Sequence, residues 1–153
     1  MLRISKLTDY GTVVLAELAN SKTGFVSAAE VAQVTGLGLP TVSKSLKTLA
    51  KAGIVTSTRG SHGGYRLSRD ANEISAADVI DAFEGPVSIT ECSASDSQCN
   101  YEAVCSVGGA WQRINLAIRR ALDEISLADL LRANSPTPRF RFAGTPISIE
   151  RKR

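Results

Sequence analysis

The 153-residue chain has few of the residues on which most enzymes depend. It contains one histidine, one tryptophan and three cysteines, and aromatic residues make up only 5% of it. We find no paired-histidine metal motif, no Ser/His/Asp set and no phosphate-binding glycine loop. The sequence therefore argues against an enzyme, and we expect no small-molecule substrate.

Long apolar runs are also missing. No stretch approaches the roughly 20 apolar residues that a membrane-spanning helix needs. The first twenty residues lack the basic start, apolar run and cleavage site of a signal peptide. We therefore expect a cytoplasmic protein with no membrane partner. In that reducing compartment, clustered cysteines more often bind metal or sense redox state than form disulfides.

Positive charge is absent from one part of the chain. Residues 71–105 contain no Lys or Arg and seven Asp or Glu, whereas residues 1–70 contain nine Lys or Arg and four Asp or Glu. A basic N-terminal part is compatible with a polyanionic partner such as nucleic acid, although an ordinary solvated surface would have a similar composition.

Three segments near the N-terminus have the spacing of helices. LTDYGTVVLAELAN places apolar residues at i, i+4 and i+8, and we predict Thr8 as its cap. SAAEVAQVTG begins with Ser27 and Glu30 in the spacing of a capping box. GLGLPTVSKSLKTLAKAG follows, with Pro40 in its first turn and Gly53 at its end.

The third segment has two distinct faces. Val42, Leu46 and Leu49 form an apolar stripe, and a second stripe is basic (Lys44, Lys47 and Lys51). A short helix, a glycine-containing turn and a longer helix with an exposed basic stripe are typical of a helix-turn-helix. A three-helix fragment with a solvated lysine face would give the same pattern.

The next segment, GIVTSTRGSHGGYRLS, predicts a β-hairpin with a glycine-rich tip. A helix-turn-helix followed at once by a hairpin is a winged helix. Arg59 and His62 lie at the predicted tip, where an arginine can enter the minor groove of DNA and a histidine can contact phosphate. The predicted fold class is therefore mainly α, with a winged helix-turn-helix and a small β-hairpin wing.

Beyond the wing, EISAADVIDAFEGP predicts a helix capped by Ser75. A long helix of about 19 residues is predicted from about Ser106, outside the winged-helix core. Its apolar residues recur at three- and four-residue steps, which resembles the seam of a two-helix coiled coil. We expect that seam to form a homodimer interface, although packing within one chain remains an alternative. Its residues are Trp111, Ile114, Ile118, Ala121 and Ile125.

These patterns divide the chain into four parts. Residues 1–85 are predicted to form the DNA-binding domain and residues 86–105 the cysteine-rich loop. Residues 106–133 are predicted to contain the dimerisation helix and a short C-terminal helix, SLADLL. Residues 134–153 contain three prolines and end in ERKR, and we predict a largely disordered basic tail.

Several of these stretches resemble one family. KLTDYGTVVLAELA, the RGSHGGYRL wing, ISAADVIDAFEGP and the C-x6-C-x5-C loop followed by WQRINLAI resemble the IscR/NsrR group of bacterial regulators, also called the Rrf-two family. Within that family the chain most resembles regulators of the SUF iron–sulfur assembly system. The resemblance covers residues 1 to about 132 and implies a homodimeric repressor that binds double-stranded palindromic promoter DNA.

The resemblance also implies roles for individual residues. Thr41, Ser43 and Lys44 fall on positions that face base edges, and Lys47 falls on a phosphate contact. Arg59 matches the wing arginine, and we include His62 and Tyr65 of the same hairpin among the DNA-binding candidates. The three thiolates that hold an iron–sulfur cluster, 2Fe–2S or 4Fe–4S, correspond to Cys92, Cys99 and Cys105.

The fourth cluster ligand departs from the family pattern. The IscR branch has a histidine three residues after its last cysteine, where this chain has Gly108. In the nitric-oxide-sensing branch, an aspartate near the start of the first helix of the other subunit completes the site, and Asp9 occupies the matching place. We predict Asp9 as the fourth ligand, and the alternatives are a bound small thiol or one of four side chains: Glu91, Asp96, Glu102 and His62.

Two other hypotheses stay open from the sequence. The same DNA-binding fold could use thiol oxidation, zinc or nitric oxide as its signal, without a role at assembly genes. An electron carrier or cluster donor whose winged helix binds only protein is a third possibility, against which the basic stripe and Arg59 argue.

Overall fold

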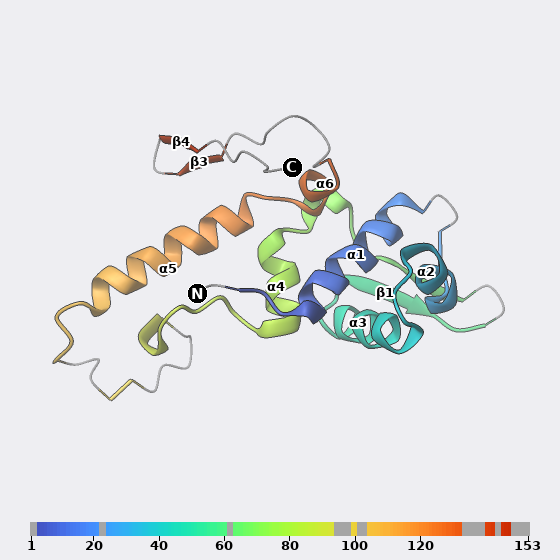
Figure 1. The fold of residues 1–153 in the computed structure, drawn as a ribbon, viewed down its shortest axis with the longest axis horizontal. Coiled ribbons are helices and arrows are strands. Elements are labelled where there is room, and N and C mark those ends of the chain that lie inside the picture. Colours follow the sequence, from blue (N-terminus) through green and yellow to red (C-terminus); the bar gives the residue numbers. More distant parts are fainter. Residues whose placement is uncertain are drawn as a thin grey trace.

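The computed structural model describes residues 3–21, 24–60, 63–93, 99–100, 104–132, 140–142 and 145–147. Helices dominate the described residues, and two short hairpins accompany them (Figure 1). The elements in chain order are α1 (Lys6–Asn20), α2 (Ala28–Thr35), α3 (Leu39–Lys51), β1 (Val55–Thr58), β2 (Gly64–Leu67), η1 (Ala71–Glu73), α4 (Ala76–Glu84), η2 (Glu91–Ser93), α5 (Gly108–Asp123), α6 (Leu127–Leu131), β3 (Phe140–Phe142) and β4 (Thr145–Ile147).

The core lies among α1, α2, α3 and the first hairpin, and the predicted winged helix is confirmed. The apolar stripe of α3 is fully buried there, as its spacing predicts. Residues from later elements complete the core, so α6 is part of the same folded unit. The fully buried apolar side chains are Val14, Leu15, Val31, Val42, Leu46, Leu49, Ile74, Ala77 and Leu127.

The wing is an antiparallel hairpin with β1 paired to β2, from Val55↔Leu67 to Thr58↔Gly64. A further bridge joins Tyr65 to Val26, which lies two residues before α2 begins. Gly64 has a positive φ of 158°, and a Cβ atom there would lie 2.6 Å from the Val26 carbonyl oxygen. Glycine at this position therefore lets the wing pack closely on the helix-turn-helix.

The start of α1 differs from the prediction. Ser5, and not Thr8, is the N-cap, and its hydroxyl accepts a hydrogen bond from the Thr8 amide. Thr8 is buried, and its hydroxyl donates to the carboxylate of Glu84 at the end of α4. Thr8 does not serve as the cap because its hydroxyl binds Glu84, a tertiary contact that the local sequence does not reveal.

Helix α5 follows the cysteine segment and leads the chain back toward α4 and α6 (Figure 1). It has 16 residues, so it begins two residues later and ends about one residue earlier than the predicted helix of about 19 residues from Ser106. Ile125 lies beyond the helix, where its carbonyl oxygen accepts a hydrogen bond from the Ala76 amide. Ser126 then caps α6 through a capping box with Asp129, which forces the chain out of the α5 helix.

Within residues 134–153, for which we predict a largely disordered tail, the structure describes two short strands. Strands β3 and β4 pair antiparallel there, with Phe140 opposite Ile147. The other tail residues lie outside the described part. Among the described residues, no helix is long and apolar enough to cross a membrane.

Candidate nucleic-acid interface and cysteine segment

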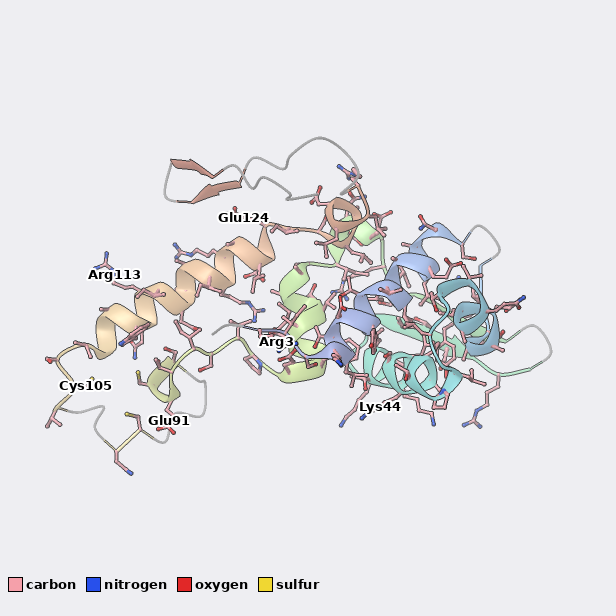
Figure 2. All side chains as sticks on the ribbon, viewed as in Figure 1. Arg3, Lys44, Glu91, Cys105, Arg113 and Glu124 are labelled. Carbon is pink, nitrogen blue, oxygen red and sulfur yellow. The ribbon has the colours of Figure 1, made fainter. Side chains whose placement is uncertain are left out.

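Helix α3 presents the basic face that the sequence predicts. Pro40 begins the helix, and the burial of Val42, Leu46 and Leu49 turns the opposite face outward. The three exposed lysines lie on that face, and Figure 2 shows Lys44 pointing away from the protein. Among the described residues none of these lysines forms an ion pair, so their charges are available for phosphate.

The remaining candidates near α3 fall into different environments. Thr41 and Ser43 are half-buried on the N-terminal half of the helix, the part that reaches base edges in a helix-turn-helix. Arg59 is exposed and follows β1 directly, so it lies at the start of the wing tip. Tyr65 is half-buried, and its amide and carbonyl groups bond to Val26. His62 lies outside the described residues.

The cysteine segment runs between α4 and α5, at the end of the molecule away from the wing (Figure 2). Cys92 lies in η2, and its Sγ is 3.2 Å from the Thr90 hydroxyl. Cys105 lies three residues before α5 begins. Cys92, Cys99 and Cys105 are half-buried thiols, and none of them is in a disulfide.

Within the described ranges, no three Cys, His, Asp or Glu side chains lie close enough together to hold a metal ion. The donor set nevertheless fits an iron–sulfur cluster by its chemistry, because three thiols on one short segment supply the soft ligands that such clusters require. Asp96 and Glu102 lie outside the described part, and Glu91 is exposed in η2.

Asp9 is exposed in the first turn of α1, where the positive end of the helix dipole favours an acidic residue. The described residues include no hydrogen-bond or ion-pair partner for its carboxylate. It is therefore available as a ligand.

Sequence reasoning missed a contact that joins the cysteine side of the fold to α1. Glu84 Oε1 accepts hydrogen bonds from the Ser5 amide at 2.8 Å and from the Thr8 hydroxyl at 2.5 Å. The hydrogen bond from Thr8 is the main cause that lowers the pKa of Glu84 below its ordinary value. The last residue of α4 thus holds the N-terminus of α1, and two residues further on the chain enters the segment that leads to Cys92.

A second missed contact joins α4 to α5. Arg119 donates to Asp81 at 2.6 Å and also pairs with Asp123 on its own helix. The hydrogen bond to Asp81 raises the pKa of Arg119 above its usual range. Gln112 and Asn115 of α5 also bond to the Cys92 carbonyl oxygen and the Ile89 amide. The cysteine segment and α4 are therefore both attached to one side of α5.

The comparisons with known proteins agree with this architecture. A family described as Rrf2, iron-dependent transcriptional regulator, matches residues 4–133. The chain belongs to the Rrf2 family. Rrf2 regulators bind DNA and usually act as dimers. This Rrf2 protein is therefore a DNA-binding transcriptional regulator, and its family is one of regulators and not of enzymes.

Individual Rrf2 relatives are similar over most of their length. Protein rrf2 of Nitratidesulfovibrio vulgaris is 34% identical over 139 residues, which are 90% of this chain and 93% of the relative. The structure of CymR, the global cysteine regulator of B. subtilis, has a TM-score of 0.66 and 32% identity, covering 87% of this chain and 98% of CymR. The structure of T. potens IscR has a TM-score of 0.64 and 30% identity, and the match covers 88% of this chain and 89% of the IscR chain.

Proposed function

We propose that the protein is a homodimeric repressor whose affinity for palindromic promoter DNA depends on an iron–sulfur cluster held by Cys92, Cys99 and Cys105. The observation that carries the proposal is the arrangement of the three thiols on the segment between α4 and α5, with α4 attached to α1. In this division residues 1–85 read DNA, residues 86–105 sense, and residues 106–133 dimerise.

For DNA reading, we assign base-edge contacts to Thr41, Ser43 and Lys44 and a phosphate contact to Lys47. These side chains share the solvent-facing part of α3. Arg59, His62 and Tyr65 belong to the predicted wing, and Arg59 is exposed at the start of its tip. A dimer repeats this set at a second half-site, which is why a palindromic operator is expected.

For sensing, the three thiolates would hold the cluster, and Asp9 of the other subunit is the proposed fourth ligand. When bound, the cluster supplies iron that reacts with oxygen or nitric oxide. A carboxylate is a harder ligand than a thiolate, so one iron would be held less firmly than the rest. Asp9 is exposed on α1, as a ligand donated to another subunit must be.

The contacts of Glu84 suggest how the two functions are coupled. Glu84 ends α4 and holds the start of α1, and α1 packs along α3. A change in the segment after Glu84 would therefore shift the N-terminus of α1 and, through the shared core, the recognition helix.

The test is anaerobic purification followed by iron and sulfide analysis and operator binding. Wild-type protein should be coloured and contain stoichiometric sulfide, and the iron count should distinguish 2Fe–2S from 4Fe–4S. Cys99→Ala should be a folded, colourless dimer with an altered operator affinity, whereas Ser106→Ala on the same segment should match the wild type. A coloured Cys99→Ala protein would contradict the assignment.

A second candidate function is a thiol-responsive repressor, and the likeness to CymR, a global cysteine regulator, favours considering it. Here metal-free protein would lose or gain DNA affinity when two of its three thiols are oxidised to a disulfide. A colourless wild-type protein without iron or sulfide, whose operator binding responds to oxidant, would establish this function instead. Stoichiometric zinc would indicate the zinc alternative.

We further propose that genes of the SUF iron–sulfur assembly system are among the targets, which rests on the sequence resemblance. The protein should protect a palindrome in that promoter from nuclease digestion at physiological salt. Protection of other promoters only would retain the repressor and remove the assembly role.

A further inference from the structure

Helix α5 has two features that its own chain leaves unmatched. Trp111 and Ile114 in its N-terminal half are 43% and 45% exposed, although both are large and apolar. In its C-terminal half, Ile118 and Leu122 line a cleft of about 490 Å³ that also contacts the start of the chain and the end of α4. The cleft is mainly apolar, with Ile4, Ile80 and Val87 opposite α5.

The Trp111 side chain cannot fill the cleft of its own subunit. Trp111 lies seven residues before Ile118, or about 10 Å along the helix axis, and eleven residues, about 16 Å, before Leu122. Figure 1 shows the N-terminal half of α5 as the part of the helix farther from α4. The cleft and the tryptophan are therefore two separate exposed apolar surfaces on one helix.

A two-fold axis perpendicular to α5 would match the two surfaces. In an antiparallel pairing centred at Leu116, Ile114 lies opposite the partner's Ile118, and Trp111 lies within one residue of the level of the partner's Leu122. The same operation places the partner's Trp111 against this cleft, so each subunit supplies both the tryptophan and its receptor. A parallel pairing would instead place the two tryptophans beside each other and leave both clefts open.

We propose that Trp111 anchors the homodimer by inserting into the partner's cleft between α5 and the end of α4. This rests on the proposed homodimer and specifies its contact. A cleft of this volume lies within the roughly 300–1,000 Å³ range of pockets that accept bulky apolar groups. Arg3 and Glu84 border the apolar wall and supply the polar rim that is usual around a buried aromatic anchor.

Charge is compatible with this pairing. Arg113 and Arg120 lie about 160–180° around the helix from Trp111, so both point away from the antiparallel seam. Arg119 is directed to Asp81 of its own α4. Ala117 and Ala121 lie beside Ile114 on the seam face, where their small side chains allow the two helices to approach closely.

The chain contains only this tryptophan, so its fluorescence reports the contact directly. Dilution of metal-free wild-type protein should shift the emission to longer wavelength at the same concentration at which sedimentation shows the dimer dissociating. Trp111→Ala should raise the dimer dissociation constant about 100-fold, as loss of a buried aromatic anchor does. Leu116→Ala is the matched control, because Leu116 is exposed but lies about 140° from Trp111 on the helix.

A mixing experiment tests whether the contact is made between subunits. Ile80→Asp alters the cleft and keeps the tryptophan, whereas Trp111→Ala removes the tryptophan and keeps the cleft. Each variant alone should be largely monomeric. Their mixture should form heterodimers, because one intact tryptophan–cleft pair is regenerated. Circular dichroism of both variants verifies that each remains folded.

Several outcomes would overturn the proposal. These are a wild-type emission that does not change as the dimer dissociates, a Trp111→Ala protein that remains a tight dimer, and two monomeric variants that do not recombine. In each case a dimer and its cluster could still exist, so the proposed function would stand. A wild type that is monomeric at every concentration would instead contradict the proposed homodimer itself.

Discussion

At the scale of single residues, two buried hydroxyl groups have opposite consequences. Thr8 is 1% exposed and donates to Glu84, whereas Ser45 is fully buried in α3 and its Oγ has no hydrogen-bond partner among the described residues. A satisfied buried hydroxyl stabilises the fold modestly, and an unsatisfied one costs its full desolvation. The two residues look alike in the sequence, so only their surroundings separate them.

Thr8→Val should therefore lower the free energy of unfolding by about 1–2 kcal/mol, since it removes one hydrogen bond to a carboxylate. Ser45→Ala should leave it unchanged or raise it by up to about 1 kcal/mol, because no bond is lost. Urea unfolding of both variants measures the difference. An equal loss of stability in both would show that the Ser45 hydroxyl has a partner, such as a water molecule.

The carboxylate of Glu84 should make part of the stability dependent on pH. Its folded-state pKa is lowered, chiefly by the hydrogen bond from Thr8, from the ordinary value of 4.5. Its stabilising effect is then fully present above that value and is lost as the pH falls through the lower folded pKa. The stability difference between wild type and Glu84→Gln should thus shrink on acidification below about pH 4.5, whereas Glu124→Gln, an exposed control, should show no such trend.

At the scale of elements, helices α1 and α4 pack more closely than their sequences suggest. A Cβ atom on Gly11 would lie 2.3 Å from the ring of Phe83, so any larger residue at this contact requires the ring to shift. By contrast, a Cβ atom on Gly109 in the first turn of α5 would meet nothing within 4 Å. The first glycine serves packing between helices, and the second does not.

Gly11→Ala should destabilise the protein by about 1–3 kcal/mol, because the Phe83 ring must shift to make room. Gly109→Ala should instead stabilise it by up to about 1 kcal/mol through its higher helix propensity. Thermal unfolding compares the two. Adding Phe83→Leu to Gly11→Ala should recover part of the loss, and no recovery would place the strain elsewhere.

The lysine face of α3 should act as an electrostatic surface. Lys47→Ala should weaken binding to operator and non-operator DNA alike, and should reduce the slope of log K against log salt by about 1. Lys6→Ala is a matched control, since Lys6 is exposed on α1 and outside the proposed interface. Loss of sequence preference with an unchanged salt slope would instead assign Lys47 to a base contact.

At the scale of the whole molecule, the side chains that connect α5 to the winged helix should determine the spacing of the two winged helices in the proposed dimer. Arg119 binds Asp81 of α4, and both side chains are about one-third exposed, at 32% and 28%. The neighbouring Arg120 is exposed and has no ion pair among the described residues. Substituting each arginine in turn therefore separates the effect of the Arg119–Asp81 ion pair from the effect of removing one positive charge.

Arg119→Ala should lower the free energy of unfolding by about 1–2 kcal/mol, because the half-buried Asp81 carboxylate loses its partner. It should also weaken binding to a full palindrome more than binding to a single half-site, as the angle of α5 is less restrained. Arg120→Ala should change neither the free energy of unfolding nor the binding to a full palindrome relative to a half-site. An equal loss of affinity for the full palindrome and the half-site would show that Arg119 does not set the spacing of the two winged helices.

The local sequence by itself determined the winged helix-turn-helix. Capping boxes, glycine stops and the apolar stripe of α3 depend on residues within one or two turns, so the helix-turn-helix, the hairpin and the lysine face were all predictable. The roles of Ser5 at the start of α1 and of Ile125 beyond α5 were not, because each depends on a residue more than 45 positions away, Glu84 and Ala76 respectively.

Only the tertiary structure decided how the sensing and reading parts are joined. The contacts of Glu84 with α1, Phe83 with Gly11 and Arg119 with Asp81 all link elements that are distant in the sequence. No period or motif marks such residues, since a carboxylate at a helix end or a glycine within a helix has many uses. Their partners became evident once α1, α4 and α5 were packed together, and so did the cleft that we assign to Trp111.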